Sequence, residues 1–512
     1  EPFATCKDPM ARAGTLQGPV HVPRLSLVAA LAFLLAGIAF PKWKEWWPSS
    51  GTGWWRDEFL RWSEPIDTFN YIKRVPWEYV SIETSHGRVI DSTIFENGAP
   101  IVITGSPIQS WDAMEKWNIE YFVRKIPYLF GVFVNRDNGV FIYHDKHAKD
   151  LIKHHLERGW RPTYQIENMT SETFFQSCIE EDYMDPKSFV YFSNSLENLR
   201  NLKHGSRYEE RGLEQDIPSN TTKIFAVPPG FASERAQQER ILWIGSTGVT
   251  NNVHFDAVHN FYAQIFGVKS FILFPPRSHR GLHLFPRSHP SWRHSRIPDI
   301  NVEMSQFGKY FELSSQALRV TLAPGELLYL PPYYFHQVRA ETCSISISFW
   351  TTSDEDELIQ KATSLPVPFE HFWTTEQKLI AAAAFLSQLL KDFSETSQTN
   401  QKPEELLTTL LETRLRRNCN LELKHIKFHC TSEWLKSLRG KFEQYSQQIA
   451  DAFAKLRSKG VAEMMILDFV EELATWAAKE PLMENNVYNV DDTVSDLLCW
   501  ALSSCLPSMA SE

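Results

Sequence analysis

The sequence predicts a mainly β domain, built as an antiparallel barrel or jelly roll with flanking helices, followed by an all-helical region. Three observations carry this expectation. Short strand signals crowd between residues 240 and 350, helical patterns take over after about Asp354, and an uncharged apolar run occupies residues 25–40. The 512 residues, 43% hydrophobic and 22% charged, allow two or three domains and exclude wholesale disorder, a collagen or an all-membrane protein.

Charge and cysteine content narrow the class of protein further. Seven cysteines are too sparse for a disulfide scaffold, and their odd number leaves at least one unpaired within the chain. The net charge of −10 disfavours a dedicated nucleic-acid binder, although it does not exclude one. Seven of the 17 tryptophans fall between Trp43 and Trp77.

The amino-terminal part reads as a tail (1–24), a hydrophobic segment (25–40) and a Trp-rich tether (41–80). The apolar run is slightly short for a bilayer, but tryptophans follow it at once, as at a membrane interface, so we expect a single-pass anchor. A cleaved signal peptide and a buried core helix are the alternatives. The side of the membrane stays open, either the secretory pathway or the cytosol. Two Asn-x-Thr glycosylation sequons, at Asn168 and Asn220, would matter only in a lumenal protein.

The expected domain at 81–352 begins with a strand at 99–107. A helix is expected at 111–126 with Ser110 as its N-cap, and then a hairpin around the turn at 137–139. Further strands are expected within 240–245, 261–267 and 268–276, with a hairpin on Pro324-Gly325. The segment 343–350 alternates strictly, which places Cys343, Ile345, Ile347 and Phe349 on one face of a strand.

The region 353–512 carries helical signals. A capping box from Thr374 to Gln377 opens one helix, and Pro403 suits the first residue of another. Two further helical runs, 431–459 and 461–479, flank Gly460. These helices either form a homodimer interface or pack on the barrel within the chain.

One constellation carries chemistry. His254 and Asp256 share a face if their segment is a strand, and His336 follows the run LLYLPPYYF. Two histidines and one carboxylate form the facial triad of non-haem Fe(II) oxygenases. The spacing alone is weak evidence for a metal site, since a lone His-x-Asp is more often ordinary surface structure.

The surroundings strengthen the interpretation. The stretches LWIGSTGVTNNVHFDAVHNFYAQIFGVKSFILFPP, LAPGELLYLPPYYFHQV and SISISFW together resemble the JmjC-type, cupin-like 2-oxoglutarate oxygenases, and most of all the asparaginyl hydroxylases that inhibit hypoxia-inducible factor. The resemblance covers about residues 95–352. It implies a double-stranded β-helix and a dioxygenase that uses Fe(II) and 2-oxoglutarate to hydroxylate a protein side chain, releasing succinate and CO₂.

The resemblance also implies residue roles. His254, Asp256 and His336 would be the catalytic Fe(II) ligands, and Lys269 would bind the distal carboxylate of 2-oxoglutarate, which suits a point cation. Tyr191 would help to hold that carboxylate, although a plain core tyrosine fits as well, and Asn260 would lie near the metal-bound end. Asn251 and Ser348 replace a family threonine and asparagine. Both still form hydrogen bonds, but they put the substrate in doubt.

A basic loop interrupts the acidic chain. Residues 277–298 hold five arginines, four histidines and no acidic residue. The functional interpretation is a loop at the mouth of the site that receives an acidic protein segment; the plain one is a solvated connection. Metal binding by these histidines is disfavoured because the arginines repel cations.

Three functions compete. The first is a protein hydroxylase, the second a tRNA-base hydroxylase, and the third a non-catalytic interaction protein that keeps the fold. The complete triad with Lys269 argues against the third. Histone demethylation is less favoured, since no Cys-rich zinc module of a chromatin reader is present and a membrane anchor conflicts with it.

Overall fold

The computed structural model describes residues 70–85, 87–179, 188–199, 212–298, 300, 313, 315–365, 367, 369–370, 372–397, 401–415, 433–485 and 490–501. They all belong to one compact unit, Thr68–Glu512. The expected tail, hydrophobic segment and most of the tether lie outside the described residues. Within them, no helix combines the length and the apolar character that crossing a bilayer requires.

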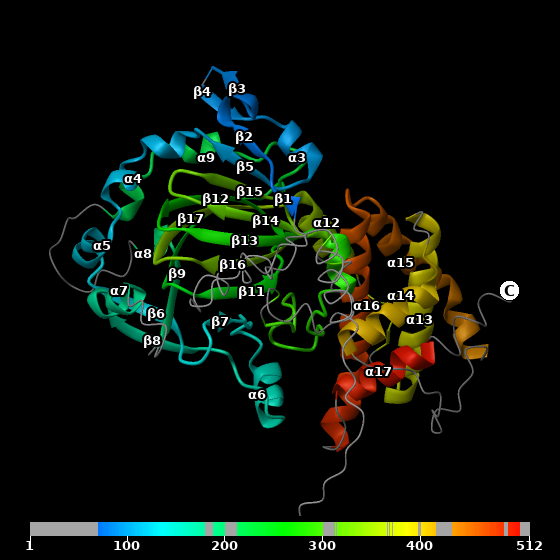
Figure 1. Cartoon of the computed structure of the whole chain (residues 1–512). Helices are drawn as coiled ribbons and strands as arrows, with labels where there is room; N and C mark the ends of the chain where they lie inside the picture. The colour runs from blue at the N-terminus through cyan, green and yellow to red at the C-terminus, as the bar shows by residue number, and fades with distance from the viewer. Residues whose placement is uncertain are drawn as a thin grey trace, which may run out of the picture. The chain divides into compact units, whose positions relative to one another are not determined.

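Two antiparallel-rich sheets form the body of the unit (Figure 1). The six-stranded sheet has the order β1 (Asn70–Tyr71), β14 (Leu318–Leu322), β13 (Lys269–Phe274), β16 (Phe335–Ala340), β11 (Thr250–His254) and β7 (Val140–Phe141). The nine-stranded sheet has the order β2 (Arg74–Pro76), β5 (Ile101–Thr104), β15 (Leu327–Leu330), β12 (Val258–Phe266), β17 (Ser344–Thr352), β10 (Gln238–Gly245), β9 (Phe189–Ser195), β6 (Tyr128–Asn135) and β8 (Gln165–Thr170). A separate pair joins β3 (Ser81–Thr84) to β4 (Gly87–Ile90).

Successive strands cross between the two sheets. From β11 to β17, four strands (β11, β13, β14, β16) enter the six-stranded sheet and three (β12, β15, β17) enter the other. The expected strands are present, but the prediction of a hairpin on Pro324-Gly325 is wrong. β14 and β15 lie in different sheets, and β15 pairs with β12 and β5 instead. This alternation is the double-stranded β-helix that the resemblance implied.

The prediction of a hairpin around 137–139 is also wrong, although the turn itself forms. Asn135 accepts three backbone N–H groups through Oδ1, from Asp137, Asn138 and Gly139. The turn therefore forms locally. Its two flanking strands then separate, because β6 pairs with β8 and β9 while β7 pairs with β11 of the other sheet.

Short helices surround the sheets. They are η2 (Trp77–Tyr79), α3 (Thr93–Asn97), η3 (Pro107–Ser110), α4 (Asp112–Lys116), α5 (Ile119–Lys125), α6 (Lys149–Glu157), α7 (Ser171–Ile179), α8 (Leu196–Leu199), η4 (Leu213–Asp216), α9 (Thr221–Ile224) and η5 (Pro276–Arg280). The single helix expected at 111–126 is two helices, α4 and α5. Asn118 breaks it, because its extended backbone and side chain cap α5 by accepting the N–H of Tyr121. Ser110 caps neither helix.

Helices dominate after β17, as expected. They are α12 (Asp354–Thr363), α13 (Thr375–Thr396), α14 (Pro403–Leu410), η7 (Leu411–Leu415), α15 (Glu433–Ala454), α16 (Lys459–Asn485) and α17 (Val490–Trp500). The capping box at Thr374 and Gln377 and the first-position Pro403 are both confirmed. Gly460 does not separate two helices. It lies in the first turn of α16, where an added Cβ would stand 2.6 Å from the backbone nitrogen of Arg277.

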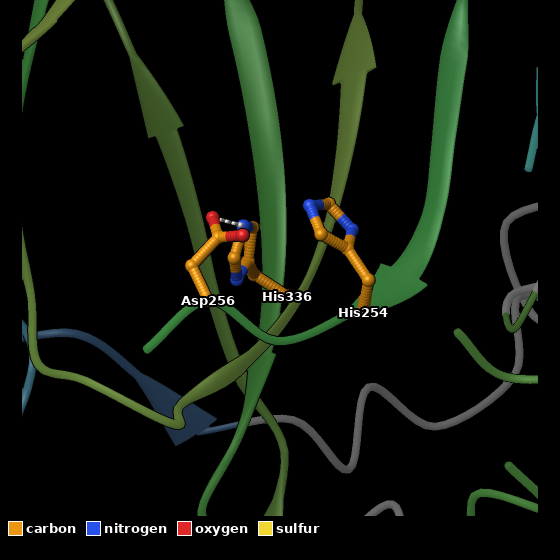
Figure 2. Close-up of side chains that lie close together, drawn as sticks. All are labelled: His254, Asp256 and His336. Carbon is orange, nitrogen blue, oxygen red and sulfur yellow. Dashed lines mark ion pairs between the residues drawn. The ribbon is translucent and has the colours of Figure 1, made fainter. Parts of the chain in front are cut away.

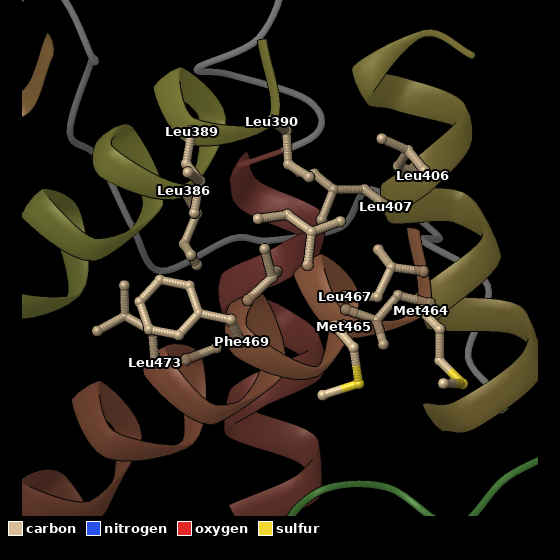
Figure 3. Packing of buried hydrophobic residues seen from close by; sticks show 14 of the residues in the cluster. Leu386, Leu389, Leu390, Leu406, Leu407, Met464, Met465, Leu467, Phe469 and Leu473 are labelled. Atoms are coloured by element: carbon tan, nitrogen blue, oxygen red, sulfur yellow. The ribbon is translucent and has the colours of Figure 1, made fainter. Parts of the chain in front are cut away.

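The helices pack on the barrel within the chain. One hydrophobic cluster contains Phe255 and Phe335 beside the barrel strands together with leucines of α13, α14 and α16. Figure 3 shows Leu386 and Leu407 facing Phe469 and Leu467 in this cluster. A second cluster buries Cys343, Ile345, Ile347 and Phe349, the predicted face of β17, beneath the helices on the outside of the nine-stranded sheet. A dimer interface on the helices stays a prediction.

Candidate functional site

The three residues of the expected triad meet at one end of β11 and β16. His254 is the last residue of β11, and it pairs directly with His336 across the antiparallel ladder. Directly opposed residues share a face of a sheet, so the two rings lie together, with centroids 4.2 Å apart. Asp256 lies just beyond the strand and reaches His336, with Oδ2 3.6 Å from Nε2. Figure 2 shows the three side chains turned toward one space.

The geometry fits a divalent metal ion. One ligand atom from each of the three residues lies within 4.8 Å of the other two, and this is the one such cluster that the described residues contain. Nδ1 of His254 donates to Asn252 O at 2.7 Å, and Nδ1 of His336 donates to Tyr334 O at 3.0 Å. Because both protons sit on Nδ1, each Nε2 keeps a free lone pair for a metal. Burial lowers the pKa of His336 to about 4, which keeps its ring neutral.

Lys269, the first residue of β13, is a buried cation. It is 1% exposed, and Nζ donates to the hydroxyl of Tyr262 at 2.7 Å and to Ser346 at 3.0 Å. Burial alone lowers its pKa to about 7, so no carboxylate among the described residues offsets the cost. Only two neutral hydroxyls offset this charge, and one of them belongs to Tyr262 of the cavity wall, so an anion nearby would be stabilised. The lysine thus fits an anionic co-substrate better than it fits a plain structural role.

The other expected co-substrate residues surround one cavity. Tyr191, Asn251, Asn260 and Ser348 line it together with the triad, and it encloses about 290 Å³. Asn251 donates to the Tyr191 hydroxyl at 3.0 Å, while Ser348 accepts from Trp243 Nε1 at 2.9 Å. The amide oxygens of Asn251 and Asn260 are buried without a partner. Unpaired buried acceptors of this kind are expected where a ligand binds.

Several residues in the cavity wall or beside it were not foreseen. Tyr262 and Ser346 hold Lys269, and Trp243 and Trp350 belong to the lining. The sequence did contain a signal for Ser346 and Ser348. They alternate with isoleucines on a strand that is buried on both faces, so the serine face of β17 had to meet something polar.

The side chains of the basic loop 277–298 point to two different places. Two of its five arginines face α16, where Arg280 pairs with Glu463 and Arg287 pairs with Glu472 at 3.2 Å. The charges of these two arginines are therefore paired within the chain, and an acidic partner segment for the loop stays a prediction. His294, by contrast, enters the cavity. It is buried, and its ring stacks on that of His254 with the centroids 5.0 Å apart. Neither of its ring nitrogens has a hydrogen-bond partner.

Comparison with known proteins finds relatives over part of the chain. The chain is 28% identical over 265 residues to Lysine-specific demethylase JMJ30 of Arabidopsis thaliana, which covers 51% of each chain. It is 24% identical over 298 residues to Jumonji C domain-containing protein 5 of Drosophila melanogaster, covering 56% of this chain and 64% of that one. A segment of 129 residues is 33% identical to HSPB1-associated protein 1 of Homo sapiens, covering 24% and 26%.

The chain therefore spans about half to under two thirds of the length of the first two relatives. A family model described as the cupin-like domain matches residues 88–357, which is more than half of the chain and includes every residue of the candidate site. The protein belongs to the cupin-like domain family.

Proposed function

We propose that this protein is an Fe(II)- and 2-oxoglutarate-dependent dioxygenase that hydroxylates a side chain of a partner protein. The observation that carries the proposal is the pairing of a preformed triad with a buried lysine that lacks a counter-charge. His254, Asp256 and His336 would hold the iron, and Lys269 would bind the distal carboxylate of 2-oxoglutarate. Tyr191, Asn251, Asn260 and Ser348 would complete the co-substrate pocket.

The reaction balances without any further cofactor. Bound iron supplies the activation of O₂, so that one oxygen atom enters a substrate C–H bond and the other enters 2-oxoglutarate, which leaves as succinate and CO₂. The protein's share is to hold, orient and shield. Aromatic side chains make up much of the cavity wall, including Phe133, Tyr143, Trp243 and Trp350, and such a wall limits the access of water.

The direct test is turnover of 2-oxoglutarate by the full chain. Succinate formation should require Fe(II) and should be lost in Asp256→Ala. The matched control is Asp150→Ala, since Asp150 is an exposed carboxylate of α6. Equal succinate formation by the wild type and Asp256→Ala would contradict the proposal that the protein is a dioxygenase.

The substrate needs a separate experiment. Masses shifted by +16 Da should be sought among proteins and tRNA, comparing cells that carry the wild type with cells that carry His254→Ala. An amide side chain is the first candidate because of the resemblance to asparaginyl hydroxylases. A shift in tRNA alone would favour the base hydroxylase instead.

A lysine demethylase is the second candidate, because two of the relatives bear that name. Hydroxylation of an N-methyl group uses the same chemistry, and the product then loses formaldehyde. Formaldehyde release from an N-methyl-lysine peptide, dependent on His336, would favour this reaction over stable hydroxylation.

A further inference from the structure

The catalytic unit contains a buried disulfide. Cys178 of α7 is bonded to Cys343, the residue before β17, across 165 residues of sequence. The two side chains are 0% and 6% exposed. Cys499 is disulfide-bonded as well. Disulfides persist in oxidising compartments and are rare in the cytosol, where thiols are kept reduced.

The bond is part of the architecture around the site. Cys343 leads into the strand that carries Ser346 and Ser348, and Cys178 lies against the carbonyl of Gly245 on β10. Gly245 in turn packs on the ring of Tyr191, where an added Cβ would stand 2.9 Å away. A bond this deep in the fold would form while the chain folds, and this favours an oxidising compartment of folding.

The two sequons are an independent observation. Asn168 lies on β8, which is an edge strand of the nine-stranded sheet, and its side chain is exposed. Asn220 lies in the turn that begins α9, is exposed, and forms no side-chain capping bond. The hydroxyl residues of the sequons, Thr170 and Thr222, are exposed too. Both asparagines can therefore carry a bulky, solvated glycan without disturbing the core.

We propose that the catalytic unit lies on the lumenal side of the secretory pathway and is N-glycosylated at Asn168 and Asn220. A glycan on β8 would also block that edge strand from pairing with another chain. The segment 25–40, outside the described residues, would direct the chain into the secretory pathway, either as an anchor with a cytosolic amino end or as a cleaved signal peptide. The substrate of such an enzyme would be a lumenal or secreted protein.

The test uses the full chain expressed in eukaryotic cells. Treatment with an N-glycosidase should increase the electrophoretic mobility of the wild type, and Asn168→Gln and Asn220→Gln should each remove one step. Threonine variants are the matched controls. Thr170→Ala and Thr222→Ala should abolish the same steps, whereas Thr170→Ser and Thr222→Ser should keep them because serine preserves the sequon.

A second readout does not depend on glycans. Cys178 and Cys343 should resist alkylation in denaturant until a reductant is added. Free thiols at both positions, or a wild type whose mobility the glycosidase leaves unchanged, would overturn the proposal. If only one of the two asparagines carries a glycan, the lumenal placement is supported and the other asparagine is not a glycosylation site. None of these outcomes depends on enzymatic turnover, so failure here is distinct from failure of the dioxygenase proposal.

Discussion

His254 and His336 are direct partners across the antiparallel pair of β11 and β16, and both donate Nδ1–H to a backbone carbonyl two residues earlier. The same local bond thus sets the tautomer of both rings. The candidate metal site is built by the sheet register together with two short backbone contacts. Only Asp256 reaches it from beyond a strand.

Metal binding should stabilise the fold measurably. Fe(II) added to metal-free wild type at a hundred times its Kd should add about 2.7 kcal/mol to the free energy of unfolding, because the ion binds only the folded state. Asp256→Ala should lose most of this gain, whereas Asp150→Ala should keep it. Thermal melts with and without Fe(II), under argon, measure the difference. Identical shifts in Asp256→Ala and wild type would place the metal elsewhere.

Lys269→Met separates binding from stability. Loss of one partner of a buried charge pair costs about 2–5 kcal/mol of binding, so the Kd for 2-oxoglutarate should rise at least tenfold. The free energy of unfolding without ligand should stay equal or rise, since the variant removes an uncompensated buried charge. Lys153→Met, on the exposed side of α6, is the matched control. A destabilised variant with normal affinity would make Lys269 a structural residue.

The affinity for 2-oxoglutarate should depend on pH near neutrality. Burial lowers the pKa of Lys269 to about 7 in the ligand-free protein, and the dianion needs the protonated amine. Binding therefore takes up a proton above pH 7, and the affinity should fall by up to about tenfold per pH unit there. Below pH 7 it should level off. Anaerobic calorimetry at pH 6, 7, 8 and 9 gives the profile, and a constant affinity across this range would contradict it.

The disulfide should contribute strongly to stability. Cys343→Ser opens a bond that spans 165 residues, and the loss of a native disulfide typically costs about 2–5 kcal/mol. Denaturant unfolding of Cys343→Ser and of the double variant Cys178→Ser/Cys343→Ser measures this. The two variants should be about equally destabilised, because each lacks the same bond. A Cys343→Ser protein as stable as the wild type would mean that the bond is not formed.

A buried ion network joins the helices to the basic loop. Arg414 of η7, 3% exposed, pairs with Asp468 and with Glu471 at 3.3 Å, and Glu471 also accepts the backbone N–H of Arg287. Arg414→Met leaves two buried carboxylates uncompensated. The cost should be about 3–5 kcal/mol, measured as the change in free energy of unfolding.

This cost should vary with pH in a defined direction. Burial raises the pKa of Glu471 to about 7, above its unfolded value of 4.5, so its contribution is largest at low pH and is lost as the pH rises through 7. The charge of Arg414 lowers this pKa, so removing Arg414 raises it further, and Arg414→Met should be more destabilised at pH 8 than at pH 6. Adding Glu471→Gln should remove most of that difference, and a cost independent of pH would rule out Glu471 as its source.

Much of the site was readable from the sequence because its signals are local. A His-x-Asp beside a strand, a lysine after a glycine turn and a strictly alternating strand each have a fixed geometric meaning. The expectations failed where the partner of a segment had to be known. The turns at 137–139 and at Pro324-Gly325 reverse the chain as expected, but the flanking strands enter different sheets. Turn chemistry determines a reversal of direction, whereas pairing depends on strands far away in the sequence.

By itself, the sequence determined the strand content, the helical region with its capping box, and the residue types of the candidate metal and co-substrate sites. Only the tertiary structure decided what those residues meet. It buries Lys269 without a counter-charge, brings His294 onto His254, pairs Arg280 and Arg287 of the loop with glutamates of α16, and joins Cys178 to Cys343. Each of these depends on contacts between segments that are distant in the chain, and the free energy of such contacts belongs to the packed fold rather than to any local pattern.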